Sequence, residues 1–217
     1  MKILKFKKQS KDKYKLYLDN NSDITLYEDV IIKNNLLITK EISDELLEAL
    51  KKQNNDMYAY TLALGYISVK MRSIKEINDY LIKKGFNNLV ANKVSERLIK
   101  EGYLNDLKYA KSFINDSMNL TNKGPQKIKM ELIKYGVNKD IIESEIALID
   151  QRKVEEKLNK LIDKELKIKK GSQNAIKIKI INHFVNLGYS KDLVTSILMS
   201  KEITSDKSKL KKDYAKL

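Results

Sequence analysis

The sequence contains no cysteine and no tryptophan, and only one proline and one histidine among its 217 residues. The lack of cysteine excludes a disulfide framework and thiolate metal sites. A single histidine, His183, cannot build a histidine-based metal centre. One proline and seven glycines are too few for an all-β sandwich, whose many turns need these residues. These scarcities favour a mainly α-helical chain without a metal.

Long apolar runs and enzyme motifs are also missing. No apolar run approaches the ~18–20 residues that a membrane span needs, and the N-terminal residues lack the apolar core of a signal peptide. The sequence has no Walker A loop, no glycine-rich dinucleotide loop, no zinc-protease HExxH and no nucleophile elbow. We therefore expect a cytoplasmic protein that is not an enzyme, contacts no membrane and has no catalytic residue, cofactor or metal.

Positive charge is present in excess. The chain has 43 basic and 29 acidic residues, a net charge of +14. The excess lies at the two ends, because the net charge is +4 over residues 1–40, +1 over 41–150 and +9 over 151–217. This balance is typical of a protein that contacts a polyanion such as nucleic acid. The lysine, asparagine and isoleucine bias of an AT-rich genome explains the total equally well.

The first 38 residues have a different periodicity from the rest. KILKFKK and KYKLYLD alternate apolar and polar residues, as half-buried strands do. LYEDVII and NNLLI, which follow, are compatible with further short extended pieces. The sequence predicts a β-hairpin-like or three-stranded element over residues 1–38. A leading helix over 39–55 follows, with Ser43 as its N-cap.

The rest of the chain repeats one supersecondary unit of three helices three times. Each copy has a glycine, then an apolar residue, a polar cap and an amphipathic helix; the glycines are Gly85, Gly136 and Gly188. Glycine suits the C′ position of a helix, where φ is positive, and the apolar residue after it packs back on that helix. The predicted N-caps of the following helices are Asn88, Asn138 and Ser190.

Two further helices precede each glycine. The expected helices lie at 57–71 and 74–84, at 105–121 and 125–135, and at 152–170 and 173–187. The last of these has isoleucines alternating with lysines like a strand, but its register with the other copies predicts a helix. The expected repeats are 56–102, 103–151 and 152–201, followed by a basic tail at 202–217.

The junction EGYLNDLKYAKSFI (101–114) is unusually apolar for a connection between repeats. Gly102 ends one helix, and Asn105 is the predicted N-cap of the next. Leu104 and Tyr109 then occupy the N′ and N4 positions, whose side chains form a hydrophobic staple. The pattern indicates a junction of defined angle.

Lysines gather in two helical segments of the second and third repeats. The candidates for phosphate contacts are Lys123, Lys127, Lys134, Lys164, Lys167, Lys169, Lys170, Lys177 and Lys179. Lysines on one concave surface would bind phosphates without sequence preference. A solvent-exposed, lysine-rich helix surface explains the same pattern about as well. The carboxylates between lysines, as in KVEEKLNKLIDKELK, are typical of an ion-paired helix surface.

Three motifs, in this order, resemble the RecX family of regulatory proteins, which modulate the recombinase RecA. YISVKMRS and IKEINDYLIKKGF (66–86) are similar to its basic turn ending in Arg-Ser and the helix after it. EGYLNDLKYAKSFI is similar to its Gly-aromatic-Leu-Asn-Asp junction, and NKGPQKIKMELIKYGV (122–137) to its Gly-Pro-basic segment. The resemblance covers about residues 40–200.

The resemblance implies tandem three-helix repeats in an extended, curved array that lies in the groove of a RecA–DNA filament and inhibits its ATPase and strand exchange. It also implies that Lys70 and Arg72, in the basic turn, contact the filament or DNA, although the family's turn is richer in arginine. The expected partners are the RecA filament and single- or double-stranded DNA, and we expect a monomer. The alternative is a stand-alone helical protein that recognises DNA or RNA by charge and shape.

Overall fold

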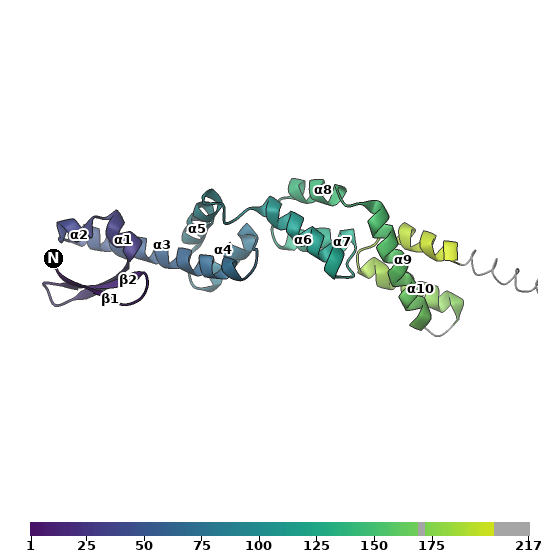
Figure 1. Ribbon diagram of the computed structural model, residues 1–217, viewed down its shortest axis with the longest axis horizontal. Helices are drawn as coiled ribbons and strands as arrows, with labels where there is room; N and C mark the ends of the chain where they lie inside the picture. Colours follow the sequence, from purple (N-terminus) through teal and green to yellow (C-terminus); the bar gives the residue numbers. More distant parts are fainter. Residues whose placement is uncertain (169–171, 202–217) are drawn as a thin grey trace, which may run out of the picture. The chain divides into compact units, whose positions relative to one another are not determined.

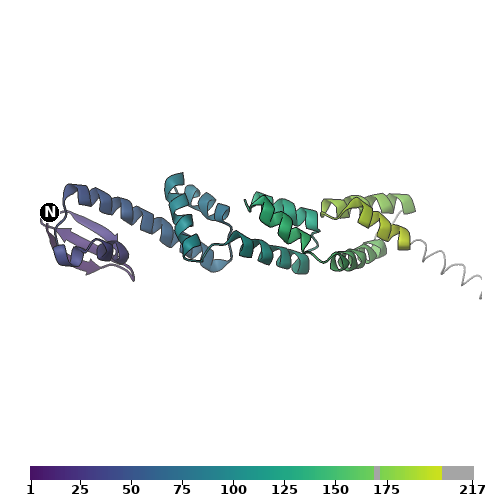
Figure 2. The same cartoon turned by 90° about the horizontal axis from the view of Figure 1, so that it is seen from above.

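The computed structural model describes residues 1–168 and 172–201. The chain divides into two compact units, a first unit up to Leu104 and a second unit from Asn105. Helices predominate in both, and a small sheet begins the first unit (Figures 1 and 2). This confirms a mainly α-helical chain with an N-terminal β element. The curved array stays a prediction, and the expected tail at 202–217 lies outside the described residues.

Three strands form the sheet of the first unit. They are antiparallel, in the order β1 (Ile3–Lys8), β2 (Lys13–Leu18) and β3 (Asp23–Tyr27). Phe6 pairs with Leu16, and Leu16 pairs with Ile24, so these apolar side chains share the inner face. Leu16 is completely buried there. The alternation read from the sequence therefore describes this sheet correctly.

The expectation of extended pieces after β3 is wrong. The chain turns directly into α1 (Glu28–Lys33), and α2 (Leu36–Thr39) follows. Glu28 and Asp29 lie in the first turn of α1, where carboxylates favour the positive end of the helix dipole. Both helices are shorter than two full turns, and periodicity does not distinguish a helix from a strand over so few residues.

The leading helix and the first helix of the first repeat are one helix, α3 (Asp44–Val69), so the predicted break near residue 55 is wrong. Ser43 caps α3 as predicted, because its Oγ accepts from the N–H of Leu46 at 3.1 Å. The side-chain amide of Asn54, at the expected break, is hydrogen-bonded to the backbone of β3. The N–H of Tyr27 donates to Asn54 Oδ1 at 2.9 Å, and Asn54 Nδ2 donates to the carbonyl oxygen of Thr25 at 3.1 Å.

Two short helices pack on the second half of α3. They are α4 (Ile74–Lys83) and α5 (Asn88–Lys100). Their shared core includes Ala63, Ile77 and Leu98, all fully buried. The N-cap of α5 is Asn87 rather than the predicted Asn88, because Asn87 Oδ1 accepts from the N–H of Val90 at 2.9 Å.

The second unit consists of helices. They are α6 (Asp106–Leu120), α7 (Pro125–Lys134), α8 (Lys139–Ala147), α9 (Gln151–Ile168), α10 (Gln173–Asn186) and a helical segment at 191–201. One core lies among α6, α7 and α8, and a second includes buried residues of α9 and α10. The strand-like isoleucines at 176–180 are helical, as predicted, because α10 buries Ile180 against α9.

Within the described residues, four glycines end helices with positive φ, between 76° and 94°. At Gly85, the glycine N–H donates to the carbonyl oxygen of Ile82 and the N–H of Phe86 to that of Leu81. The same pair of bonds recurs at Gly102, Gly136 and Gly188, so the predicted Schellman endings are confirmed. Asn105 and Asn138 cap α6 and α8 as predicted, and Ser190 accepts from the N–H of Leu193 at 3.3 Å. The staple expected between Leu104 and Tyr109 falls across the boundary of the two units and stays a prediction.

Candidate anion-binding groove

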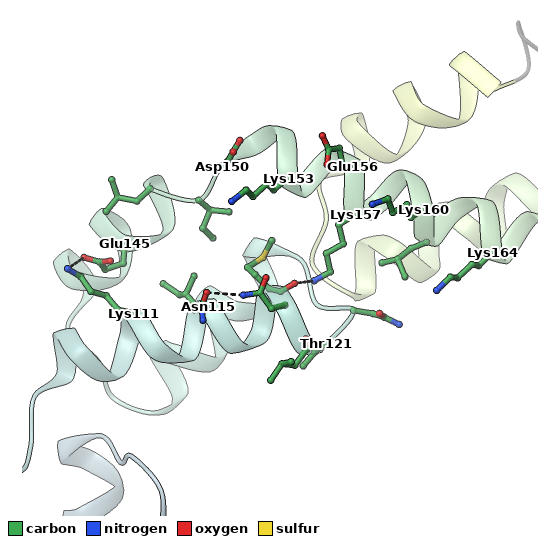
Figure 3. Close-up of a pocket in the computed structure, with 18 residues that line it drawn as sticks. Lys111, Asn115, Thr121, Glu145, Asp150, Lys153, Glu156, Lys157, Lys160 and Lys164 are labelled. Atoms are coloured by element: carbon green, nitrogen blue, oxygen red, sulfur yellow. Dashed lines mark hydrogen bonds and ion pairs between the residues drawn. The ribbon is translucent and has the colours of Figure 1, made fainter.

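An open groove of about 850 Å³ runs along the second unit between α6 and α9. Figure 3 shows the side chains that line it, with α6 on one side and α9 on the other. Its charged residues are Lys111, Glu145, Asp150, Lys153, Glu156, Lys157, Lys160 and Lys164. The groove therefore has an excess of positive charge in a chain that is itself basic.

Four of these lysines lie on one face of α9, and their spacing of four, three and four residues keeps them in one row. They are Lys153, Lys157, Lys160 and Lys164. A different face of α9 carries Val154, Leu158 and Ile162, which are buried in the core with α10. The burial of these apolar residues turns the lysines toward the groove. We call Lys153, Lys160 and Lys164, which are exposed, the lysine row.

The lysine row has no carboxylate partner within the residues that the structure describes. Asp163 of the same helix pairs instead with Lys201, at 2.7 Å. The expectation of an ion-paired surface on this segment therefore does not hold for these three lysines. Exposed cations without a partner are available to an anion that enters the groove.

Lys157 has a different role from the lysine row. It is half-buried, and its Nζ donates to the carbonyl oxygen of Met118 at 2.7 Å and to that of Lys123 at 3.4 Å. Burial lowers the pKa of Lys157 below the ordinary lysine value. Met118 lies in the last turn of α6, where free carbonyl groups favour a cation. Lys157 therefore holds α9 against α6 and shapes the groove.

The α6 side of the groove is amidic and apolar. Asn119 Nδ2 donates to Asn115 Oδ1 at 2.9 Å, and Ile114 and Met118 also line the groove. Lys111 pairs with Glu145 at 3.7 Å. Within the described residues no cluster of histidine and carboxylate groups could hold a metal ion. The free positive charge of the groove therefore comes from α9.

The Gly-Pro motif forms a helix junction inside the second unit. Gly124 is the N-cap of α7 and Pro125 is its first residue. The N–H of Gly124 donates to the carbonyl oxygen of Leu187 at 2.7 Å, and that of Gln126 to Gly188 at 3.0 Å. A Cβ on Gly188 would lie 2.2 Å from the backbone nitrogen of Lys127, so no larger residue fits. The motif thus fixes α10 against the start of α7.

The predicted binding lysines of the second unit are scattered. Lys164 lines the groove, and Lys167 is exposed nearby on α9. The others described lie on α7 and α10 or just before α7: Lys123, Lys127, Lys134, Lys177 and Lys179. Lys123 is ion-paired with Glu131, at 2.6 Å. Lys169 and Lys170 lie outside the described residues. The structure thus does not unite these lysines in one site.

The two residues of the basic turn belong to the first unit. Lys70 is exposed immediately after α3. Only 11% of the Arg72 side chain is exposed, and its guanidinium lies 3.8 Å from the centre of the Tyr66 ring and pairs with Glu76 at 3.3 Å. Arg72 is therefore largely covered by residues of α3 and α4, and its expected contact with the filament or DNA stays a prediction.

Sequence reasoning missed Lys153 and Lys160. The signal was present, because the regular spacing of lysines in KVEEKLNKLIDK places them on one helical face. Carboxylates lie at positions between the lysines, and this pattern is equally typical of an ion-paired surface. Only the packing of α9 against α10 shows which face is free.

Comparison with known proteins identifies the family. The family descriptions "RecX, first three-helix domain" and "RecX, second three-helix domain" match residues 59–98 and 105–144. Regulatory protein RecX of Streptococcus uberis is 37% identical over 207 residues, which cover 95% of this chain and 79% of that protein. Regulatory protein RecX of Streptococcus agalactiae serotype V is 32% identical over 229 residues, 100% of this chain and 86% of that protein.

Solved structures agree with these sequence matches. A crystal structure of regulatory protein RecX has a TM-score of 0.78 at 23% identity, over 90% of this chain and 98% of the other. The crystal structure of RecX from Lactobacillus salivarius has a TM-score of 0.63 at 27% identity, over 70% of this chain and 99% of the other. None of the described helices is long and apolar enough to span a membrane. The chain belongs to the RecX family of regulatory proteins.

Proposed function

We propose that this protein binds a filament of the recombinase RecA on DNA and inhibits its ATPase and strand-exchange activities. Family membership supports the regulatory role. The observation that carries the binding proposal is the lysine row on α9, which consists of three exposed cations without ion-pair partners among the described residues. In this proposal the protein acts as a monomer in the cytoplasm.

The proposed mechanism is occupation of the filament's groove. A DNA-bound filament repeats the same anionic phosphates and the same protomer surface along its axis, so a chain of repeated three-helix units can contact adjacent protomers together. The lysine row contacts phosphate or carboxylate groups there, with an affinity that falls as salt rises. If the bound protein has a higher affinity for one conformational state of the filament, it holds the protomers in that state and so inhibits ATPase and strand exchange.

The test is an ATPase assay of RecA on single-stranded DNA, titrated with this protein, with strand exchange measured in parallel. We expect both activities to fall and to level off as the filament becomes saturated. Controls without the protein at each salt concentration separate its effect from the salt sensitivity of RecA. Unchanged ATPase and strand exchange at a stoichiometric ratio would contradict the proposal. Binding to bare DNA that RecA does not alter would favour a stand-alone nucleic-acid-binding protein.

A further inference from the structure

The outer face of the N-terminal sheet is strongly basic. Lys5 is paired with Tyr17, Lys7 with Lys15, and Lys15 with Thr25, so these side chains share the face opposite the core. Lys13 lies on the same face two residues before Lys15. In Figure 1 the sheet lies to one side of α1 and α3, which cover its other, apolar face.

Two lysines on this face oppose each other directly. Lys7 and Lys15 are cross-strand partners, and like charges in that position destabilise a sheet. One carboxylate, that of Asp23, shares the face, and it lies 3.0 Å from Lys15. Lys5 and Lys7 are exposed and form no ion pair within the described part of the chain. The face therefore retains unbalanced positive charge.

Folding of the sheet does not require this charge. The inner face supplies the apolar burial, with Leu16 and Leu26 both completely buried. The edge of β3 is satisfied by the amide of Asn54. Threonine or glutamate on the outer face would serve the sheet as well and would remove the repulsion. The charge is therefore explained better by an anionic partner than by stability.

Aromatic rings accompany the lysines. Lys15 Nζ lies 5.4 Å from the centre of the Tyr17 ring. Lys13 Nζ lies 4.5 Å from the ring centre of Tyr27, which is buried, and 5.4 Å from that of Tyr58 on α3. Tyr17 is partly exposed on the same face. Surfaces that combine lysines with an accessible ring are typical of sites for nucleic-acid strands, where the cations contact phosphates and the ring stacks on a base.

We propose that the outer face of the N-terminal sheet, built from Lys5, Lys7, Lys13, Lys15 and Tyr17, is a DNA-binding surface that takes the phosphodiester backbone without sequence preference. Lysines two residues apart on a strand are about 6.8 Å apart, and neighbouring strands are about 4.8 Å apart, so the face presents a regular array of cations. The surface belongs to the first unit and is separate from the lysine row. It does not depend on recombinase binding.

The test measures binding of the full chain to a labelled single-stranded oligothymidine and to a duplex of the same length, by fluorescence anisotropy over a salt series. The variant is Lys5→Gln with Lys7→Gln. If both contacts are lost, the slope of log affinity against log salt should become shallower by about 1.4 for the single strand or about 1.8 for the duplex. The DNA probe whose salt slope changes more identifies the form of DNA that the outer face binds.

The matched control is Lys83→Gln with Lys100→Gln, which removes two exposed charges from α4 and α5 of the same unit. It should leave the slope at the parent value. Equal slopes for both double variants would overturn the proposal. A loss of binding to RecA-coated DNA with unchanged binding to bare DNA would also overturn it, because the face would then contact protein.

A thermal melt separates binding from folding. Because Lys7→Gln removes a charge opposite Lys15, the melting midpoint should stay the same or rise. If the midpoint falls instead, the single variant Lys5→Gln, opposite Tyr17, takes the place of the double variant. An unchanged DNA affinity and an unchanged salt slope in that variant would then overturn the proposal. The salt slopes are measured on bare DNA, so failure of the proposed recombinase function would not affect them.

Discussion

The amide N–H of Gly124 donates a hydrogen bond to the carbonyl oxygen of Leu187, 2.7 Å away. Gly124 is the N-cap of α7 and Leu187 is the C-cap of α10. The first amides and the last carbonyls of a helix have no partner within it, so these two ends satisfy each other. The positive end of one helix dipole also meets the negative end of the other. The contact needs glycine at 124 and 188, where a Cβ would meet backbone atoms.

We expect Gly188→Ala to destabilise the second unit more than Gly85→Ala destabilises the first. Both glycines have φ above 90° in the same Schellman ending, and alanine there costs about 1–2 kcal/mol. At Gly85 nothing lies within 4 Å of the added Cβ, whereas at Gly188 the backbone of Lys127 blocks it. Gly188→Ala should therefore cost more than about 2 kcal/mol.

Urea denaturation followed by circular dichroism measures the two losses, and hydrogen exchange locates them. Hydrogen exchange in α7 and α10 should become faster in Gly188→Ala and stay unchanged in Gly85→Ala. Equal losses of stability in the two variants would show that φ, and not the close approach, is what requires glycine at 188.

Replacing the lysine row should weaken binding to the recombinase filament. In the triple variant Lys153→Gln, Lys160→Gln, Lys164→Gln, the groove keeps its shape because Lys157 remains. We expect the concentration that half-inhibits the RecA ATPase to rise about tenfold, which corresponds to about 1.4 kcal/mol, and its salt dependence to flatten.

The control removes three exposed lysines that do not line the groove: Lys108, Lys139 and Lys191. If this control reduces inhibition as strongly as the groove variant does, net charge and not the row is responsible.

Acid sensitivity of the first unit should depend on Glu101. The Tyr60 hydroxyl donates to Glu101 Oε2 at 2.5 Å and Arg97 Nε donates to Oε1 at 2.8 Å, and these bonds hold the pKa of Glu101 below its ordinary value. A lowered pKa stabilises the fold above the unfolded-state value of about 4.3, and this stability is lost as pH falls below it. Glu101→Gln should cost about 1 kcal/mol at pH 7 and reduce the loss on acidification.

The measurement is the free energy of unfolding as a function of pH. Glu96→Gln is the control, because Glu96 is exposed on the same helix and has no ion pair among the described residues. Parallel pH profiles for parent and Glu101→Gln would mean that Glu101 does not couple folding to protonation.

Asn54 should anchor the sheet to α3. Asn54→Ala leaves the N–H of Tyr27 and the carbonyl oxygen of Thr25 without their partner, at a cost of about 1–3 kcal/mol. Asn55→Ala, one residue later and exposed, should cost little. Amide exchange at Tyr27 reports the effect directly. Slow exchange of this amide in Asn54→Ala would show that another group holds the edge of β3.

The repeats were predictable because their signals are local. Gly85, Gly136 and Gly188 require positive φ, and the same residues set where each helix ends. The spacing of apolar residues identified the buried face of each helix, because helical periodicity is also a local property of the sequence. The continuous α3 was not predictable, because the polar residues around Asn54 look like a break. Only the tertiary structure shows that Asn54 is bound to β3.

The binding surfaces show the limit of sequence reasoning. Arg72 is a typical phosphate-binding residue in sequence, yet the Tyr66 ring and Glu76 bury it. Lys153 and Lys160 looked ion-paired, yet they are free of carboxylates within the described residues. Arg72 is covered by the ring of Tyr66 from α3, and the exposed face of α9 is set by the packing of its other face against α10. Spacing along the chain contains neither contact.

The sequence by itself determined the N-terminal sheet, the helical repeats and the motifs of the RecX family, because hydrogen-bond geometry and apolar periodicity act over a few residues. The tertiary structure alone decided which lysines line a groove, and that Gly124 and Gly188 join two helix ends. These depend on contacts between residues far apart in the chain, such as Lys157 with Met118, and are set only when separate helices bury their apolar faces together.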